Sequence, residues 1–364
     1  MQWNGERLKK ICEERGFTRI QLAERLETSR QTVHSWLAGQ VPKGHHLLKL
    51  CRVLDIEPIG LFDAPPVAVS VPVHRAKANV KVTDKRQQLA HELAVTFAPL
   101  FEGAQRADVL LVIRTDGYGA DSAQQTASKL RSLAEVPDEK PCTYDYAFRL
   151  LAKLGCFVVF VPFPPDVKSY AFYSAIHGNR VVFVNQRANV LDLVFCLLHE
   201  AVHSAFDEQQ EVSKELEDYC DAVASAVQFP QPYVSFVRGL LKGLSQSQKL
   251  QIIKELAREN GHALFGLAKA LVPDDKAMHQ AAARMDNVLR KHYPTIDALL
   301  FAKGDSADYI SRYRQLSPLF CQLIEAQSDN LSARRLGELM GLESELDAAQ
   351  IKELTTRERE AWIF

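Results

Sequence analysis

The sequence has no apolar run long enough to cross a bilayer, and its N-terminus, MQWNGERLKK, lacks the apolar stretch of a signal peptide. Its seven cysteines are odd in number and form no C-x-x-C pair, which argues against a disulfide scaffold or a cysteine zinc ribbon. Neither charge sign is in excess, because 44 Lys and Arg residues oppose 45 Asp and Glu residues. We therefore expect a cytoplasmic protein without membrane association, on which any nucleic-acid surface is local.

What the sequence does have is enough chain, 364 residues, for two or three domains. Residues 1–62 contain short helical patterns, and 63–84 are rich in proline and small residues, as in a linker or an extended edge segment. Residues 85–230 mix helical and strand patterns, whereas 231–364 are periodic only as helices. These patterns predict an α+β fold that is mainly α, with domains at 1–62, 85–230 and 231–364.

The strand patterns are concentrated in the middle region, ahead of its longest helix. They predict strands at 109–113, 156–161, 170–176 and 180–184, with His177-Gly178-Asn179 as a hairpin turn between the last two. Helices are expected to follow at 190–206 and 214–228, the second ended by proline. The region should therefore hold a small sheet packed beside two consecutive helices.

The helix expected at 190–206 carries His199, Glu200 and His203 in the pattern H-E-x-x-H. Positions i and i+4 stack on one helix face, so two imidazoles there can bind one metal ion. Glu200, beside the first ligand, is then placed to act as a general base on water. The alternative is an ordinary exposed helix face that happens to carry two histidines.

A catalytic zinc site needs a third protein ligand, and the following helix offers Glu217 and Asp221 one turn apart. Glu217 is the predicted ligand. Asp221 is predicted to accept the outer N–H of a ligating histidine. The alternative for both is a solvated acidic face.

Cys196 lies one turn before His199, where it is either a thiolate inhibitor of the metal or a buried small residue. A second electrophile is left open among His177, Tyr170, Tyr173 and Tyr219.

Residues 21–36, QLAERLETSRQTVHSW, have the pattern of two short helices joined by a tight turn, with a buried apolar set and a polar face at the start of the second helix. That position makes base contacts in helix-turn-helix proteins. The local basic excess is small, so binding to double-stranded DNA would be strengthened by a homodimer on a palindrome. The alternative is a helical protein-interaction domain. The predicted DNA-contacting residues are Gln21, Ser29, Arg30, Gln31, Thr32, Ser35 and Lys43.

Two family resemblances rest on these motifs. Residues 5–62 resemble the Cro/CI-type (XRE-like) helix-turn-helix family through QLAERLETSRQTVHSWLAGQVP. Residues 120–230 resemble the ImmA/IrrE metallopeptidases through TASKLRSLAEV, RLLAKLGCFVVFVPF, RVVFVNQR, LLHEAVHSAF and ELEDYCDAVASAVQFP. The second resemblance implies a zincin-like fold and a Zn²⁺ or Mn²⁺ endopeptidase. Such enzymes cleave a DNA-binding repressor, often encoded nearby, in a stress, DNA-damage or phage-related response, and some are implicated in sensing single-stranded DNA.

An alternative function stays open. The chain could be a transcription regulator, or an antitoxin-like protein, whose peptidase fold binds metal or ligand without cleaving. A peptide substrate is predicted to pair with the strand at 180–184 as an extra strand. The stretches at 254–267 and 332–342 look either like parts of further helix-turn-helix motifs or like plain core helices, within a C-terminal region expected to regulate or sense.

Overall fold

A computed structural model describes residues 2–56, 61–63, 69–70, 84–104, 112–113, 117–167, 169–206, 213–302 and 304–361. The chain divides into two units, Met1–Val67 and Ala68–Phe364. Of the segment predicted as a linker, 64–68 and 71–83 lie outside the described residues. Val69 and Ser70 belong to the second unit, where Val69 forms a bridge with Ile176.

The N-terminal unit is a cluster of short helices whose ends are fixed by local side-chain hydrogen bonds. Thr18 and Gln21 form a reciprocal capping box, and Ser29 caps the next helix through the amide of Thr32. Gly5 is required where the first and third helices meet, because a Cβ there would lie 2.3 Å from the carbonyl oxygen of Leu37. The elements are β1 (Gln2–Trp3), α1 (Gly5–Glu14), α2 (Arg19–Arg25), α3 (Arg30–Leu37), α4 (Gly44–Leu54) and β2 (Phe62–Asp63).

The second unit is built on a sheet in which β5 (Asn179–Asn185) lies between β3 (Cys156–Val161) and β4 (Ala171–Ile176) within the described residues. β5 is parallel to β3 and antiparallel to β4. The hairpin predicted at residues 177–179 is confirmed, and its turn is tight because His177 and Gly178 both adopt positive φ, at 49° and 76°. The sheet is buried on both faces, which explains its nearly continuous apolar sequence.

One expectation about the strands is wrong, and a second is tested at two residues only. A substrate strand cannot add to residues 180–184, because β5 is paired on both sides; the edge next to it is β4. The strand predicted at 109–113 is not seen where it can be judged: residues 109–111 lie outside the described part, and Val112 and Ile113 are in no strand. The amide of Ile113 instead donates to the carbonyl of Ala205, at the end of the metal-motif helix.

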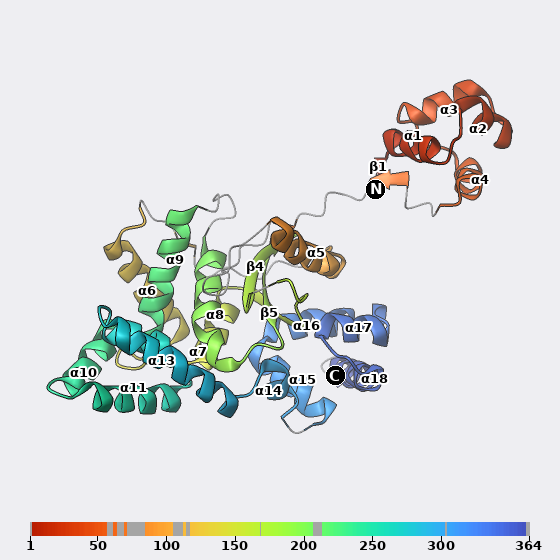
Figure 1. The fold of residues 1–364 in the computed structure, drawn as a ribbon. Helices are drawn as coiled ribbons and strands as arrows, with labels where there is room; N and C mark the ends of the chain where they lie inside the picture. Colours follow the sequence, from red (N-terminus) through yellow and green to blue (C-terminus); the bar gives the residue numbers. More distant parts are fainter. Residues whose placement is uncertain are drawn as a thin grey trace. The chain divides into compact units, whose positions relative to one another are not determined.

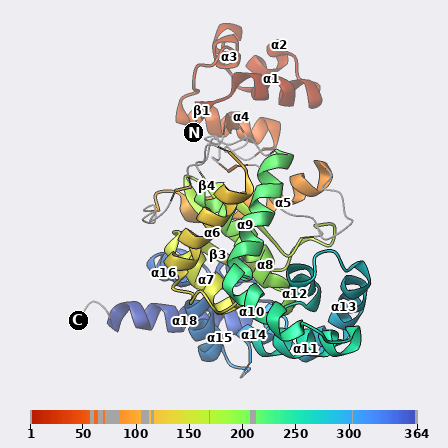
Figure 2. The same cartoon turned by 90° about the vertical axis from the view of Figure 1, so that its left-hand side faces the viewer.

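Helices cover both faces of this sheet (Figure 1). One side carries α8 (Val190–Ala205), which packs on β4 and is itself covered by α9 (Lys214–Gln228). Figure 2 shows α6 (Ala120–Ala134) and α9 side by side in front of α8. Two further helices precede α8 in the described part of this unit, α5 (Asp84–Phe101) and α7 (Tyr144–Lys153). The metal-motif helix is therefore held between a sheet and a second helix layer.

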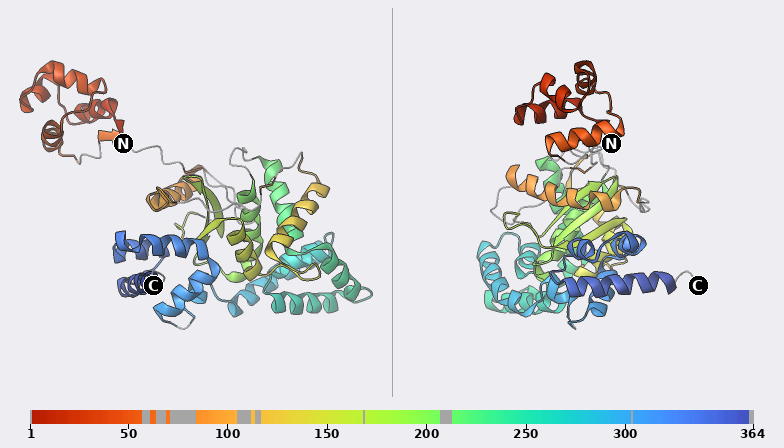
Figure 3. Two further views of the ribbon diagram at one scale, coloured as in Figure 1. Left: turned by 180° about the vertical axis from the view of Figure 1, so that it is seen from behind. Right: turned by 90° about the vertical axis from the view of Figure 1, so that its right-hand side faces the viewer.

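The C-terminal helices do not form a region apart, as 231–364 was predicted to do. The last ones, seen in blue in Figure 3, share the hydrophobic core of the sheet, and α16 and α17 contact β3 directly. Helices α10 to α13 pack around a second core that includes Leu191 of α8. The elements are α10 (Gln231–Leu241), α11 (Gln246–Asn260), α12 (Leu264–Leu271), α13 (Lys276–Leu289), η2 (Arg290–His292), α14 (Ile296–Leu300), α15 (Ser306–Leu316), α16 (Pro318–Gln327), η3 (Ser328–Asn330), α17 (Ala333–Met340) and α18 (Glu345–Ala361).

The two stretches with a possible helix-turn-helix pattern are packed as core helices. Leu336, Leu339 and Met340 of α17 are buried with the sheet, and Ile253 and Ala257 of α11 lie in the second core. In both stretches the apolar side chains are used for packing within the second unit. A core helix and a helix of a helix-turn-helix have the same apolar spacing, so the sequence pattern does not distinguish them. No helix in the described ranges is long and apolar enough to cross a membrane.

The second core contains a histidine whose neutral form is favoured, and this makes stability depend on pH. His262 is fully buried, its Nδ1 lies 3.2 Å from Nε2 of Gln228, and burial lowers its pKa to about 4. Below pH 6.5 the unfolded chain binds a proton that the folded chain excludes, so stability falls until about pH 4. We expect the free energy of unfolding to drop by about 2 kcal/mol between pH 7 and 5 from this residue.

Urea unfolding of the full chain at several pH values measures this loss, and His262→Phe should remove most of it while His292→Phe, at an exposed position, should not. Equal pH slopes for the wild type and His262→Phe would contradict the assignment.

Candidate functional site

The metal-motif helix α8 is buried because most of its residues are apolar. Its start is set by Asn189, whose side chain accepts from the amide of Leu191. His199, Glu200 and His203 are all on this helix and are 0 %, 1 % and 6 % exposed. Buried polar groups are costly without partners, so this face requires a polar counterpart. That counterpart comes from α9.

Three polar side chains meet between the two helices. The Nε2 atoms of His199 and His203 are 3.0 Å apart. Glu217 of α9 places Oε2 3.3 Å from Nε2 of His199 and Oε1 3.2 Å from Nε2 of His203. The side chains predicted as metal ligands are therefore brought together, each offering one ligand atom to a common centre.

These distances suit a small tetrahedral metal ion. Zinc bonds of about 2.0–2.2 Å at tetrahedral angles separate neighbouring ligand atoms by roughly 3.3 Å. The observed separations of 3.0, 3.2 and 3.3 Å are close to that value, and they join the two imidazole nitrogens to each other and each of them to a different oxygen of the Glu217 carboxylate. The geometry therefore allows a His-His-Glu metal site, in which a fourth position would be left for water or substrate.

The electrostatics of the cluster also favour a positive charge at its centre. Burial opposes the protonation of His199, but contacts with Asp221 and Glu217 outweigh it and raise the pKa of His199 to about 9. Burial opposes the ionisation of Glu217, yet contacts with both histidines bring its pKa down to about 2. Burial lowers the pKa of His203. The carboxylates of Glu217 and Asp221 thus favour positive charge at this point between α8 and α9.

The outer nitrogen of each histidine faces a different side chain of α9. Nδ1 of His199 lies 2.9 Å from Oδ1 of Asp221, in the position predicted for this residue. Nδ1 of His203 lies 3.8 Å from the sulfur of Cys220, a buried residue that the sequence analysis did not single out. Burial raises the pKa of the Cys220 thiol well above its ordinary value. The signal for Cys220 in the sequence is its position three residues after Glu217, which places both side chains on one helix face.

Among the residues considered as a second electrophile, Tyr219 is turned toward α6. Its hydroxyl lies 2.8 Å from that of Thr126 and 3.2 Å from that of Ser122, which ties α9 to α6. Tyr170 lies beside Asp192 and Arg290, near the start of α8. Two hydrogen bonds of 2.7 and 2.8 Å join that aspartate to the arginine. These tyrosines are held by structural contacts.

Tyr173 and His177, the other two residues considered, belong to the sheet hairpin. Tyr173 is 8 % exposed in β4. His177 is in the β4–β5 turn, where its backbone φ is positive.

The residues predicted to contact DNA divide into two groups. Arg30 and Gln31 are exposed on the first turn of α3, and Lys43 is exposed just before α4. The others have local roles: Gln21 closes the capping box with Thr18, and the hydroxyls of Ser29, Thr32 and Ser35 bond within the first turn of α3. The first group is therefore exposed at and near the start of α3, whereas Gln21 and Ser29 fix the starts of α2 and α3.

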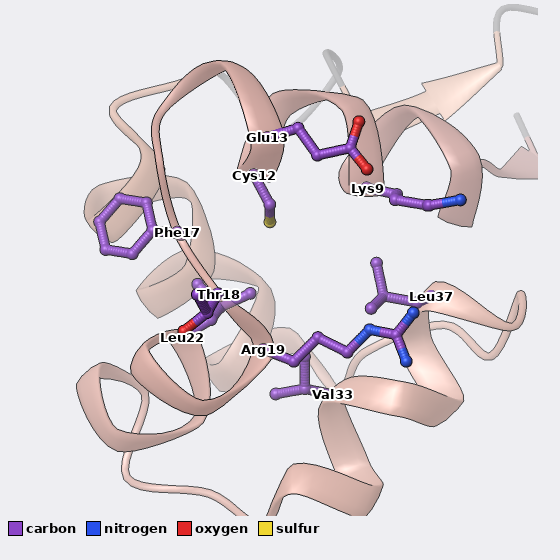
Figure 4. Close-up of a pocket in the computed structure, with 9 residues that line it drawn as sticks. All are labelled: Lys9, Cys12, Glu13, Phe17, Thr18, Arg19, Leu22, Val33 and Leu37. Atoms are coloured by element: carbon purple, nitrogen blue, oxygen red, sulfur yellow. The ribbon is translucent and has the colours of Figure 1, made fainter.

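A small hollow in this unit opens between α1, α2 and α3 (Figure 4). It has a volume of about 150 Å³ and is lined by Cys12, Leu22, Val33 and Leu37, with charged side chains around it. The sulfur of Cys12 points into it, and burial raises the pKa of this thiol to about 11. The thiol is therefore protonated near neutral pH and is a packing group.

A family model described as Helix-turn-helix (HTH_3) matches residues 8–61. Residues 8–61 are an XRE-like helix-turn-helix domain. Domains of this type bind DNA in transcription regulators, and the exposed first turn of α3 is where such a domain reads base edges. No curated protein and no solved structure matches the chain.

Proposed function

We propose that the second unit is a zinc-dependent endopeptidase of the ImmA/IrrE type, with a zincin-like fold, that cleaves a DNA-binding repressor. The observation that supports it best is the convergence of His199, His203 and Glu217 on one point, with the buried carboxylate of Glu200 on the same helix. A site that only held a metal for stability would not need that carboxylate. Manganese is the alternative metal.

In this proposal each residue has a separate task. His199, His203 and Glu217 would hold the zinc ion, which when bound would supply a Lewis acid for the scissile carbonyl and would lower the pKa of water toward about 7. Glu200 takes a proton from the attacking water and delivers it to the leaving amine. The negative charge of Glu200 helps to raise the pKa of His199, which supports a position of this carboxylate beside the ligands. Asp221 holds the His199 ring and its Nδ1 proton.

The edge strand β4 is the place where an extended substrate would pair. It packs against α8, so a peptide laid along it would run close to the motif helix. Ser70 already donates its amide to the carbonyl of Ala175 at one end of this edge. The helix-turn-helix domain supports a repressor as the substrate, because binding to an operator would raise the local concentration of the enzyme near DNA-bound proteins. Single-stranded DNA is a candidate activator.

The test combines metal analysis with cleavage. Purified full-length protein should contain one zinc or manganese ion per chain. With that metal it should cut a small helix-turn-helix repressor, first the one encoded beside it, into fragments that mass spectrometry identifies. Stoichiometric metal without cleavage of any repressor would favour the second candidate function, a transcription regulator whose metal site does not cut. The observation that favours this second function is the helix-turn-helix domain at 8–61.

DNA binding by that domain can be measured separately. We expect Arg30→Ala and Gln31→Ala each to weaken binding to a selected operator by roughly 5- to 100-fold, because each removes a contact from the exposed turn of α3. Fluorescence anisotropy at fixed salt gives the affinities. Arg25→Ala loses the same charge at the far end of α2 and should change binding little. Equal losses for Arg30→Ala and Arg25→Ala, together with no loss for Gln31→Ala, would mean that only net charge matters.

A further inference from the structure

Three residues on one face of α9 meet the two histidines of α8. Glu217, Cys220 and Asp221 are spaced by three and four positions, so they project from the same side of the helix. Glu217 contacts both inner nitrogens. Asp221 faces the outer nitrogen of His199 at 2.9 Å, and Cys220 faces the outer nitrogen of His203 at 3.8 Å. The ligand and both outer contacts thus come from a single helical turn.

The chemistry of a ligating imidazole decides the direction of the second contact. A neutral histidine that offers the lone pair of Nε2 to a metal carries its proton on Nδ1. On His203, Nδ1 lies 3.8 Å from the sulfur of Cys220, so a proton on this nitrogen would face that sulfur. We propose that Cys220 is a positioning residue, whose sulfur accepts the Nδ1–H of His203 and holds that ring for metal binding. This inference rests on the metal centre proposed above.

Burial makes this contact matter. His203 is 6 % exposed and Cys220 is 0 % exposed, so a neighbouring side chain takes the place that water would have on the surface. A buried N–H that loses its acceptor bears the cost of its desolvation. Sulfur is a weak acceptor and the thiol is neutral, whereas Asp221 gives His199 a carboxylate. The two ligands are therefore held unequally, and His203 depends on the weaker contact.

Serine is an informative replacement because its oxygen is on a shorter bond than sulfur. An N–H···O hydrogen bond needs about 2.7–3.2 Å, and a serine oxygen at position 220 would lie farther away than the present 3.8 Å of the sulfur. Cys220→Ser therefore keeps nearly the same volume and removes the contact. Cys220→Ala removes it as well, with a slightly larger loss of packing.

The experiment is a zinc titration of the full chain against a chromophoric chelator at fixed pH. We expect Cys220→Ser and Cys220→Ala to weaken zinc binding by about tenfold, the lower end of the range for residues that support metal ligands. Cys321→Ala removes another fully buried cysteine, located in α16, and should leave the affinity unchanged. Absorption of the Co²⁺-substituted protein should also change in the Cys220 variants, because the His203 ring is reoriented.

The outcomes separate the two proposals. If wild-type protein binds no zinc or cobalt, the metal centre itself is wrong. If it binds metal and both Cys220 variants bind it as tightly with an unchanged cobalt spectrum, the role of Cys220 is overturned and the centre stands. An equal loss in Cys321→Ala would assign the effect to general loosening of the core, which also overturns it. Thermal melting with chelator present identifies a variant that fails to fold. If Cys220→Ala fails to fold, the zinc affinity of Cys220→Ser decides whether Cys220 positions His203.

Discussion

Replacing Glu200 by glutamine should abolish measurable cleavage while leaving the metal in place. The amide keeps the shape of the side chain but cannot accept a proton from water, and general-base catalysis contributes roughly 10²- to 10⁴-fold to such reactions. Glu200 is 1 % exposed on α8, so the substitution does not alter the surface. The rate of repressor cleavage and the metal content of the same preparation are the two measurements.

The control for this prediction is Glu215→Gln, the same chemical change at an exposed position of α9. It should cleave like the wild type. Cleavage at the wild-type rate by Glu200→Gln would show that another residue activates water. Loss of metal from Glu200→Gln would show instead that this carboxylate belongs to the binding site.

The second large effect should be on stability. An ion that binds the folded chain alone stabilises it by about 4 kcal/mol at a thousandfold excess over its dissociation constant. For a unit of this size we expect zinc to raise the melting temperature by several degrees. His203→Ala should remove that rise, because two of the three donor atoms lie within 3.2 Å of its Nε2. The difference between melting curves with zinc and with chelator is the measurement.

His292→Ala serves as the matched control, since this histidine is exposed on η2. Its zinc-dependent rise should equal that of the wild type. If His203→Ala keeps the full rise, zinc stabilises the protein from another site and the His-His-Glu assignment fails. The comparison uses the rise and not the melting temperature itself, because removing the buried ring also leaves a cavity.

A large part of the candidate site could be predicted from residues that are close together in the sequence. The spacing of His199 and His203 places both rings on one helix face, whatever the rest of the fold does. The pattern of residues 21–36, two short helices joined by a tight turn, predicted the helix-turn-helix in the same local way, and the family match confirms that domain. The hairpin at residues 177–179 followed from its turn residues. Each of these depends on neighbours within a few positions along the chain.

What only the tertiary structure decided is which distant residues meet. The register of α9 on α8 brings Glu217 to both histidines and sets Cys220 beside His203. The order of the strands makes β4 the edge next to β5, and the packing of α16 and α17 joins the C-terminal helices to the same core. The period of the apolar residues predicts which face of a helix or strand is buried. It does not predict which other element covers that face, because the hydrophobic effect is non-directional and many elements could bury the same apolar area.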